Sequence, residues 1–277
     1  MRTERIAIGF GKGVAVVGIL MWSLFPIAFI VVSSLKSNRD IFAVPPRFVF
    51  APTIQHYIDL WTHWHVFFAG LWNSFVVTAG ATVLAVVTSA MAGFAYSRYR
   101  SRRIATTASF LVLTRLIPPI VLTLPLFPIV NWLGIDDTKF LLIVLYATFF
   151  VSLGTLLMRA FIDQIPRELD QAAAIDGAGR ATILWRIIMP LATPGMLAVA
   201  VFVIVFAWNE FIFAFVFTST QAKTAPLVIS EMAGSFDGVD WGVLFAASTV
   251  QLIPILAFVV LTQKTLVAGL TTGAMKG

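Results

Sequence analysis

Two sets of polar residues in this chain have types and spacings that suit the binding of a ligand or a partner. The first is the stretch from Arg159 to Arg186, which stands between runs of nearly pure hydrocarbon side chains. The second comprises Arg115 and the adjacent pair Asn209 and Glu210, which interrupt apolar runs. An amide that both donates and accepts hydrogen bonds, next to a charge, suits hydroxyl groups such as those of a sugar.

Residue patterns for catalysis or metal binding are missing from the sequence. His56, His63 and His65 share one loop without carboxylates at ligand spacing, and the chain has no cysteine, so disulfides and thiolate ligation of metals are excluded. No His, Asp and Ser set in the apolar runs has catalytic spacing. Residues 9–12, Gly-Phe-Gly-Lys, are only a fragment of the ATPase phosphate loop. We therefore expect a protein without metal, cofactor or enzymatic activity of its own.

The composition places the chain in a lipid bilayer. Of its 277 residues, 59% are hydrophobic and 12% are charged, whereas soluble domains carry about 25% charged residues. The apolar runs recur along the whole length, so we predict one all-α integral membrane domain. The net charge of +6 comes from basic residues scattered at the ends of these runs, which indicates membrane topology and not nucleic-acid binding.

Six uncharged stretches predict six transmembrane helices, because one crossing needs about 20 apolar residues. The second and third stretches exceed one crossing and should include a bent or interfacial part, and four prolines should break or kink the third. The first follows basic residues, as a secretory signal does, but is too long for a signal core and should remain as a helix. The stretches are residues 13–35, 66–97, 104–135 with Arg115 inside, 140–158, 187–217 with Glu210 inside, and 241–263.

The distribution of Lys and Arg predicts the orientation, because these residues resist translocation. Thirteen lie in the amino-terminal segment, residues 98–103, residues 159–186 and the carboxyl-terminal segment, against five in the loops on the other side. Both termini and the Arg159–Arg186 stretch should therefore be cytoplasmic. We divide the chain into residues 1–65, the first helix with its external loop, and residues 66–277, a five-helix core with a cytoplasmic loop at 159–190.

The cytoplasmic loop should fold into two short helices. Pro166 suits a first helical turn, and Glu168 and Asp170 complement the positive end of the helix dipole. Gly177 should end this helix, and a second helix from about residue 180 to 188 should stop before Pro190. Three- and four-residue spacing gives the first helix a nearly flat alanine face, formed by Leu169, Ala172, Ala173 and Asp176.

Small side chains on this loop allow close backbone approach, which suits a helix seated in a groove of another protein. A helix lying on lipid headgroups is the alternative, but it would favour Lys and large apolar residues over alanine and four acids. We therefore expect a soluble cytoplasmic partner.

Several segments resemble the permease subunits of ATP-binding cassette importers. Gln171-Ala172-Ala173, Asp176-Gly177 and residues 187–190 (Ile-Ile-Met-Pro) resemble the Glu-Ala-Ala loop of these inner-membrane subunits. Matches to the carbohydrate branch, which includes the smaller maltose permease subunit, lie at residues 117–119 (Ile-Pro-Pro), 133–138 (Leu-Gly-Ile-Asp-Asp-Thr), 207–211 (Ala-Trp-Asn-Glu-Phe) and 269–277 (Gly-Leu-Thr-Thr-Gly-Ala-Met-Lys-Gly). They span the chain from about residue 71 to its end. Gln171 and Met189 depart from the glutamate and leucine usual in the family, so Gln171 offers only neutral hydrogen bonds.

The resemblance implies a type I importer fold and a division of labour among subunits. This chain would be a permease in the bacterial cytoplasmic membrane, beside a second homologous permease subunit. Two ATPase subunits would bind ATP and Mg²⁺, and an extracytoplasmic solute-binding protein would deliver the substrate. The tail at residues 269–277 would reach toward the ATPase interface. The coupling helix would sit in an ATPase cleft through Glu168, Leu169, Gln171, Ala172, Ala173, Asp176, Gly177 and Pro190.

Polar groups at membrane depth usually face a cavity or a partner, because burying them in lipid is costly. At 1.5 Å per residue, Arg115 and Glu210 would lie about 16 Å and 22 Å from the cytoplasmic face and could share one layer. Either they line a pathway, or they pair with each other or with helix ends and only hold helices together. Trp208 could stack on a sugar or pack internally. The expected pathway residues are Arg115, Pro118, Trp208, Asn209 and Glu210.

A secondary transporter or channel for a small polar solute is the alternative function, since it would also have six spans with buried charges. It would not need the Glu-Ala-Ala-like loop. The resemblance favours a neutral sugar, disaccharide, polyol or glycosyl-glycerol as substrate, or an anionic sugar if Arg115 faces the pathway.

Overall fold

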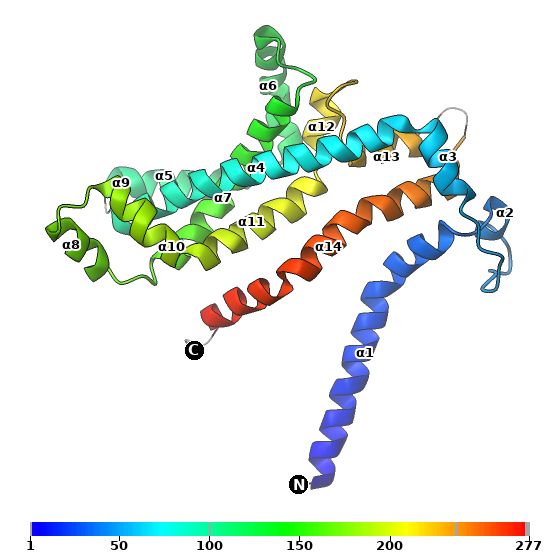
Figure 1. The fold of residues 1–277 in the computed structure, drawn as a ribbon, viewed down its shortest axis with the longest axis horizontal. Coiled ribbons are helices and arrows are strands. Elements are labelled where there is room, and N and C mark those ends of the chain that lie inside the picture. The colour runs from blue at the N-terminus through cyan, green and yellow to red at the C-terminus, as the bar shows by residue number, and fades with distance from the viewer. Residues whose placement is uncertain (1, 100, 236–237, 275–277) are drawn as a thin grey trace. The chain divides into compact units, whose positions relative to one another are not determined.

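The computed structural model describes the backbone of residues 2–99, 101–235 and 238–274, and the side chains of residues 12–99, 101–104, 106–235 and 238–263. Every regular element in this part is a helix (Figure 1). The chain packs into two compact units, one formed by Met1–Phe68 and Ile229–Pro254, the other by Ala69–Val228 and Ile255–Gly277. The division at residue 65 proposed from the sequence concerned membrane organisation and stays a prediction.

Four helices in the described part are long and apolar enough to cross a membrane. They are α1 (Arg2–Ser33), α4 (His65–Arg98), α7 (Lys139–Ile162) and α14 (Trp241–Ala274). Two bent helix pairs also qualify, α5 (Arg102–Thr114) with α6 (Pro119–Leu133) at 102°, and residues 180–191 with α11 (Thr193–Trp208) at 77°. Counting each bent pair as one span gives six. The shorter helices are α2 (Asn38–Ile41), α3 (Gln55–His63), α12 (Ile212–Phe217) and α13 (Ala225–Ala233).

The two long stretches behave differently. The predicted break in the third occurs: α5 ends in tight turns in which the Arg115 amide donates to the Val112 carbonyl at 3.2 Å, and Pro118, with φ −59° and ψ 140°, precedes α6. A bent or interfacial part is predicted for the second stretch, and there α4 runs as one helix through 34 residues without a break. The reason is that α4 contains no proline, so no backbone donor is lost.

Small residues bring α4, α7 and α11 together in the second unit. A Cβ added to Gly93 would lie 2.6 Å from the Cβ of Met158, and one added to Gly154 would meet Ser89 and Val199. Helices in membranes often pack through such small residues, because the backbones can then approach closely. Around these contacts lies a core of buried side chains that includes Tyr146 and Phe150.

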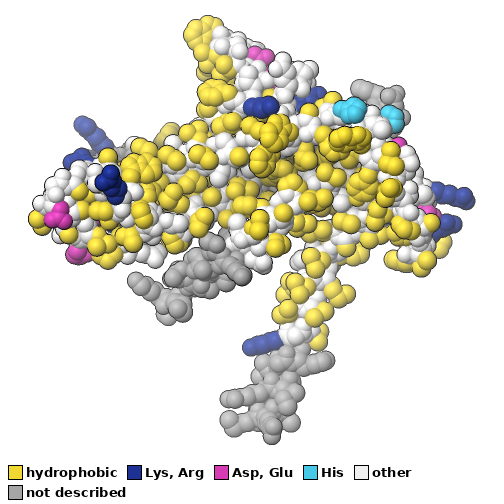
Figure 2. Space-filling view, viewed as in Figure 1, with side chains coloured by type: hydrophobic (Ala, Val, Ile, Leu, Met, Phe, Trp, Pro, Cys, Tyr) yellow, Lys and Arg dark blue, Asp and Glu magenta, His cyan; other side chains and the backbone are white. Residues whose placement is uncertain are grey.

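Apolar side chains also cover the flanks of the long helices. On the face shown in Figure 2 they dominate, and charged side chains gather where Figure 1 shows the loop around α8 (Glu168–Ile175). In α1, none of residues 12–32 is buried. Exposed hydrocarbon on this scale needs lipid or another subunit to cover it.

The predicted external loop, residues 36–65, is folded within the first unit. His56 is buried, and its Nε2 atom lies 2.7 Å from the Lys36 carbonyl oxygen. A Cβ on Gly242 would overlap the His56 ring, so the start of α14 packs against this histidine. Among the described residues, no group of three or more His, Cys, Asp or Glu is placed to hold a metal ion.

Candidate functional site

The first helix of the predicted cytoplasmic loop is α8. Glu168 and Asp170 lie in its first turn, where negative charge interacts favourably with the positive end of the helix dipole. Pro166 precedes the helix instead of lying in its first turn, because the helix starts only at Glu168. At the other end the Ala178 amide donates to the Ala173 carbonyl at 2.9 Å, and Gly177, at φ +83°, donates to Ala174 at 3.1 Å. This glycine termination is the one that the sequence predicts.

The second helix does not stop before Pro190, contrary to the prediction. Helix α9 (Arg180–Thr182) continues as the π-helical segment η1 (Ile183–Ile188) and then as α10 (Met189–Leu191). Proline has no amide hydrogen and its ring crowds the carbonyl group four residues back. The wider π turn just before Pro190 accommodates both effects without ending the helix.

The outer face of α8 is open to solvent. Leu169 is 41% exposed and Ile175 is 87% exposed, although both are large apolar residues. Ala173 differs from the prediction, because it lies on the inner side and packs against the core together with Ala178. The other predicted coupling residues are exposed, namely Glu168, Gln171, Ala172, Asp176, Gly177 and Pro190.

A buried arginine ties α8 to the end of α4. The Arg98 side chain is 7% exposed, and its Nε atom lies 2.5 Å from Asp170 Oδ2. Its Nη1 and Nη2 atoms donate to the carbonyl groups of Ile162 and Ile165 at 3.2 and 3.1 Å. Arg98 therefore joins α4, the end of α7 and the first turn of α8.

Three further residues complete this connection. Ser97 Oγ donates to Asp163 Oδ1 at 2.6 Å, and Arg167 Nη2 donates to the Ser97 carbonyl at 2.6 Å. We call Ser97, Arg98, Asp163, Arg167 and Asp170 the clasp. Charge-assisted hydrogen bonds are strong and directional, so a displacement of α8 would pull on α4 and α7 directly.

Arg115 and Glu210 lie around a cluster of phenylalanine rings. The Arg115 guanidinium carbon is 5.3 Å from the ring centre of Phe149 and 5.9 Å from that of Phe202. Its Nη1 atom is buried and has no hydrogen-bond partner. Phe149 in turn packs against Phe213 at 6.0 Å. Arg115 is therefore held by aromatic faces.

Glu210 contacts the same cluster through the backbone of Phe213. Its Oε1 atom accepts the Phe213 amide at 2.9 Å and so caps α12, while Oε2 is buried without a hydrogen-bond partner. The carboxyl group interacts with the Tyr146 hydroxyl. Between the described side chains of Arg115 and Glu210 no ion pair forms, whereas Glu210 pairs with a helix end, the other form of the structural alternative.

The remaining pathway candidates divide into exposed and buried residues. Asn209 is exposed, and its Nδ2 donates to the Val205 carbonyl at 2.8 Å. Pro118 is exposed at the break between α5 and α6. Trp208 is only 5% exposed, so in this chain it packs internally, the second of the two roles considered for it.

At the opposite ends of these helices, one carboxylate holds a loop in place. Asp137, with φ +53°, accepts hydrogen bonds from the backbone amides of all four residues from Ser219 to Ala222 at 2.9–3.1 Å. The Ser219 and Thr220 hydroxyls add bonds of 3.1 and 2.7 Å. These donors hold the pKa of Asp137 well below its usual range, against the opposing effect of burial. We call this arrangement the Asp137 clamp.

Sequence reasoning missed the clasp, the clamp and Tyr146. Arg98 entered it only as one of many positive charges, and Asp137 only as part of a family segment. Their partners lie more than 60 residues away in the chain, and no local spacing signals such a pair. The tail at residues 269–277 lies outside the residues whose side chains are described.

The helices long and apolar enough to cross a membrane define a multi-pass membrane protein. The model of the family "Binding-protein-dependent transport system inner membrane component" matches residues 85–270. The chain belongs to this family and is an ATP-binding cassette permease subunit.

Relatives and a solved structure agree with the family. The chain is 33% identical over 263 residues to the sulfoquinovosyl glycerol transport permease SmoH of Agrobacterium fabrum, covering 94% of this chain and 91% of that protein. It is 32% identical over 256 residues to the trehalose/maltose transport permease MalG of Thermococcus litoralis, covering 92% of each. A chain of a bacterial transporter that imports the acidic polysaccharide alginate has the same fold, with a TM-score of 0.79, 20% identity, and coverage of 95% and 98%.

Proposed function

We propose that this chain is one of two permease subunits in a carbohydrate importer and that α8 is its coupling helix. The observation that carries the proposal is the combination of an exposed outer face with the Arg98–Asp170 ion pair, whose side chains are only 7% and 18% exposed. A face with exposed leucine and isoleucine side chains suits a cleft in a partner. The clasp gives the partner's motion a rigid connection to α4 and α7.

The proposed orientation has six spans and both termini in the cytoplasm, with each bent pair counted as one span. The excess of Lys and Arg in residues 98–103 and 159–186 over the loops on the other side of the sequence-predicted spans supports this orientation. Two ATPase subunits, which bind ATP and Mg²⁺, would then meet α8. An extracytoplasmic solute-binding protein and the second permease subunit would complete the assembly.

For the substrate we propose a sugar, disaccharide, polyol or glycosyl-glycerol. The relatives named for sulfoquinovosyl glycerol and for trehalose and maltose support this class. Arg115, Pro118, Asn209 and Glu210 are the proposed pathway residues, with Trp208 packed behind them. The unpartnered Nη1 of Arg115 supports this role, because a buried polar atom without a partner is otherwise costly.

The absence of cysteine from the sequence permits a direct test of docking. In the assembled complex, Ala172→Cys on the outer face should form a disulfide with a cysteine introduced into the cleft of the ATPase subunit. The matched control is Ala173→Cys, which lies one residue away and faces inward. Equal cross-linking of both variants, or of neither, would contradict the proposed docking face.

The substrate class is tested separately on the solute-binding protein. Thermal stabilisation of that protein against a panel of neutral sugars, anionic sugars, polyols and glycosyl-glycerols should identify one class. Uptake of the same compound into proteoliposomes should require ATP. Uptake driven by an ion gradient, without a copurifying ATPase, would instead support a secondary transporter.

A further inference from the structure

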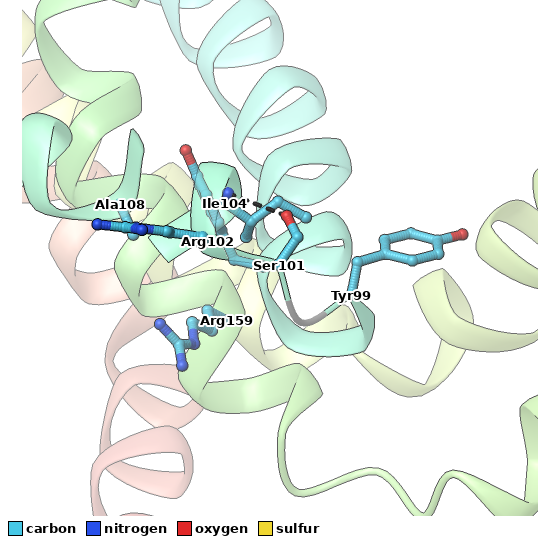
Figure 3. A pocket seen from close by; sticks show the side chains of 7 residues that line it. Tyr99, Ser101, Arg102, Ile104, Ala108 and Arg159 are labelled. Atoms are coloured by element: carbon cyan, nitrogen blue, oxygen red, sulfur yellow. Dashed lines mark hydrogen bonds between the residues drawn. The ribbon is translucent and has the colours of Figure 1, made fainter. Parts of the chain in front are cut away.

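A pocket outside the proposed coupling and pathway sites lies where three helices end. It has a volume of about 400 Å³ and is formed by the end of α4, the start of α5 and the last turns of α7. Figure 3 shows Arg102 and Arg159 reaching the same side of this pocket, while Tyr99 extends the other way. The lining residues are Tyr96, Tyr99, Ser101, Arg102, Ile104, Ala108 and Arg159.

The pocket carries positive charge that the protein itself neutralises only in part. Arg159 Nε lies 3.5 Å from Asp163 Oδ2, longer than a charge-assisted hydrogen bond of about 2.8 Å. The other oxygen of Asp163 accepts the Ser97 hydroxyl in the clasp. Within the described residues, no carboxylate pairs with Arg102. Two guanidinium groups therefore face a cavity with one distant and shared counter-charge.

The pocket is also amphipathic along α5. Ser101 caps this helix by accepting the Ile104 amide at 3.2 Å, and the guanidinium groups lie near the same end. Ile104 and Ala108 continue the lining, and Val112, one turn further along the same side of α5, is 47% exposed. A ligand that follows this gradient would have an anionic head and a hydrocarbon tail. Tyrosines beside the pocket are the residues expected where headgroups meet hydrocarbon.

We propose that this pocket binds the phosphodiester headgroup of an anionic phospholipid through Arg102 and Arg159. Basic pockets between transmembrane helices on the cytoplasmic side are suited to such headgroups. The guanidinium fork matches phosphate oxygens in pairs. The assignment to the cytoplasmic leaflet rests on the proposed orientation, whereas the binding chemistry does not. Because Asp163 belongs to the clasp and approaches Arg159, the lipid would lie directly beside the coupling connection.

The test measures lipid binding to the purified full-length chain by native mass spectrometry and by thermal unfolding. Phosphatidylglycerol should remain bound and raise the unfolding temperature, whereas phosphatidylcholine at the same concentration should not. Inorganic phosphate serves as a separate arm, because it supplies the anion without the hydrocarbon. Retention of phosphatidylglycerol together with no effect of phosphate is the expected result.

Variants locate the binding within the pocket. Arg102→Ala and Arg159→Ala should each weaken phosphatidylglycerol binding about fivefold, the effect expected for one basic residue at an anionic surface. The matched control is Arg103→Ala, since Arg103 is exposed and adjacent to Arg102 but does not line the pocket. If Arg159→Ala unfolds, Arg159→Lys replaces it: this variant keeps the charge, loses the fork and should still weaken binding.

Several results would overturn the proposal. Equal weakening by Arg103→Ala would indicate diffuse electrostatic attraction, and saturation by inorganic phosphate would indicate a soluble anion. Loss of ATPase association in Arg102→Ala without any change in lipid binding would make the pocket a protein contact. The lipid assay needs neither ATPase nor transport, so failure of the coupling proposal leaves its result intact.

Discussion

The two ends of the helical core use charge in opposite ways. At one end, the clasp buries Arg98 and Asp170 so that α8 is held from behind while its outer face stays open. At the other end, both carboxylate oxygens of Asp137 accept hydrogen bonds from the loop at residues 219–222, so neither is left for a ligand. The first arrangement secures an element that must still meet a partner. The second fixes a loop completely.

The clasp therefore connects moving helices, whereas the Asp137 clamp fixes a loop. The clasp links three helices through side chains, so a force on α8 passes to α4 and α7. The clamp links a turn to backbone amides, and backbone donors have little freedom to rearrange. We therefore expect changes at the clasp to affect coupling first and changes at the clamp to affect stability first.

The largest effect on transport is expected for substitutions at the exposed end of α8. Gly177→Asp and Asp176→Arg should abolish transport while the protein remains in the membrane, because α8 no longer docks. The matched control is Gly179→Asp: a side chain at either glycine meets open space, but only Gly177 has a positive φ. Substrate-stimulated ATPase activity of the assembled complex is the measurement. Normal substrate stimulation of the ATPase in the Gly177→Asp complex would contradict the proposed docking of α8.

Arg98→Ala should have the next largest effect. It leaves Asp170 without its counter-charge at low exposure, which costs about 3 kcal/mol for a buried pair, so the unfolding temperature should fall. ATPase activity in the complex should persist but lose its dependence on substrate. The double variant Arg98→Ala with Asp170→Ala should recover part of the lost stability. If the double variant is no more stable than the sum of the single changes predicts, Arg98 and Asp170 do not act as a pair.

Asp137→Asn should lower stability without uncoupling the ATPase. An amide offers one acceptor oxygen where the carboxylate offers two, and the expected loss is about 2 kcal/mol, as for a hydrogen bond to a charged group. Folding lowers the pKa of Asp137, so the ionised carboxylate stabilises the folded protein. This stabilisation is fully present at pH values above the usual pKa range of a carboxyl group, and it is lost as the pH falls through the lowered pKa. Thermal unfolding from neutral to strongly acidic pH should therefore show an acid-sensitive component in the original protein that Asp137→Asn lacks. If the ATPase of the Asp137→Asn complex no longer depended on substrate, the expectation that the clamp affects stability and not coupling would be wrong.

The smallest effect on transport is expected for substitutions of Glu210. Glu210→Ala should reduce transport about fivefold, the loss of one hydrogen bond worth about 1 kcal/mol, without dissociating the complex. Glu210→Gln keeps an oxygen for the Phe213 amide and should separate a lining role from the capping of α12. Copurification of all subunits together with initial uptake rates provides the measurement. Dissociation of the Glu210→Ala complex would favour a structural role.

Much of the fold follows from local patterns. The apolar runs predict the spans because hydrocarbon length sets the length of a helix, and the prolines at 118 and 119 mark the observed break. Gly177 ends α8 as predicted, because only its backbone adopts the left-handed conformation without strain. Pro190 misled the prediction, since a π turn accommodated a residue that usually ends a helix.

The sequence by itself determined the membrane class, the position of the exposed loop and the family, since each depends on composition or on residues close together in the chain. Only the tertiary structure decided that Arg98 reaches Asp170, that Asp137 meets residues 219–222, and that Arg115 and Glu210 do not pair. Those outcomes depend on which helix ends are brought together. Packing decides this through contacts such as those of Gly93 and Gly154, and no spacing along the chain reveals it.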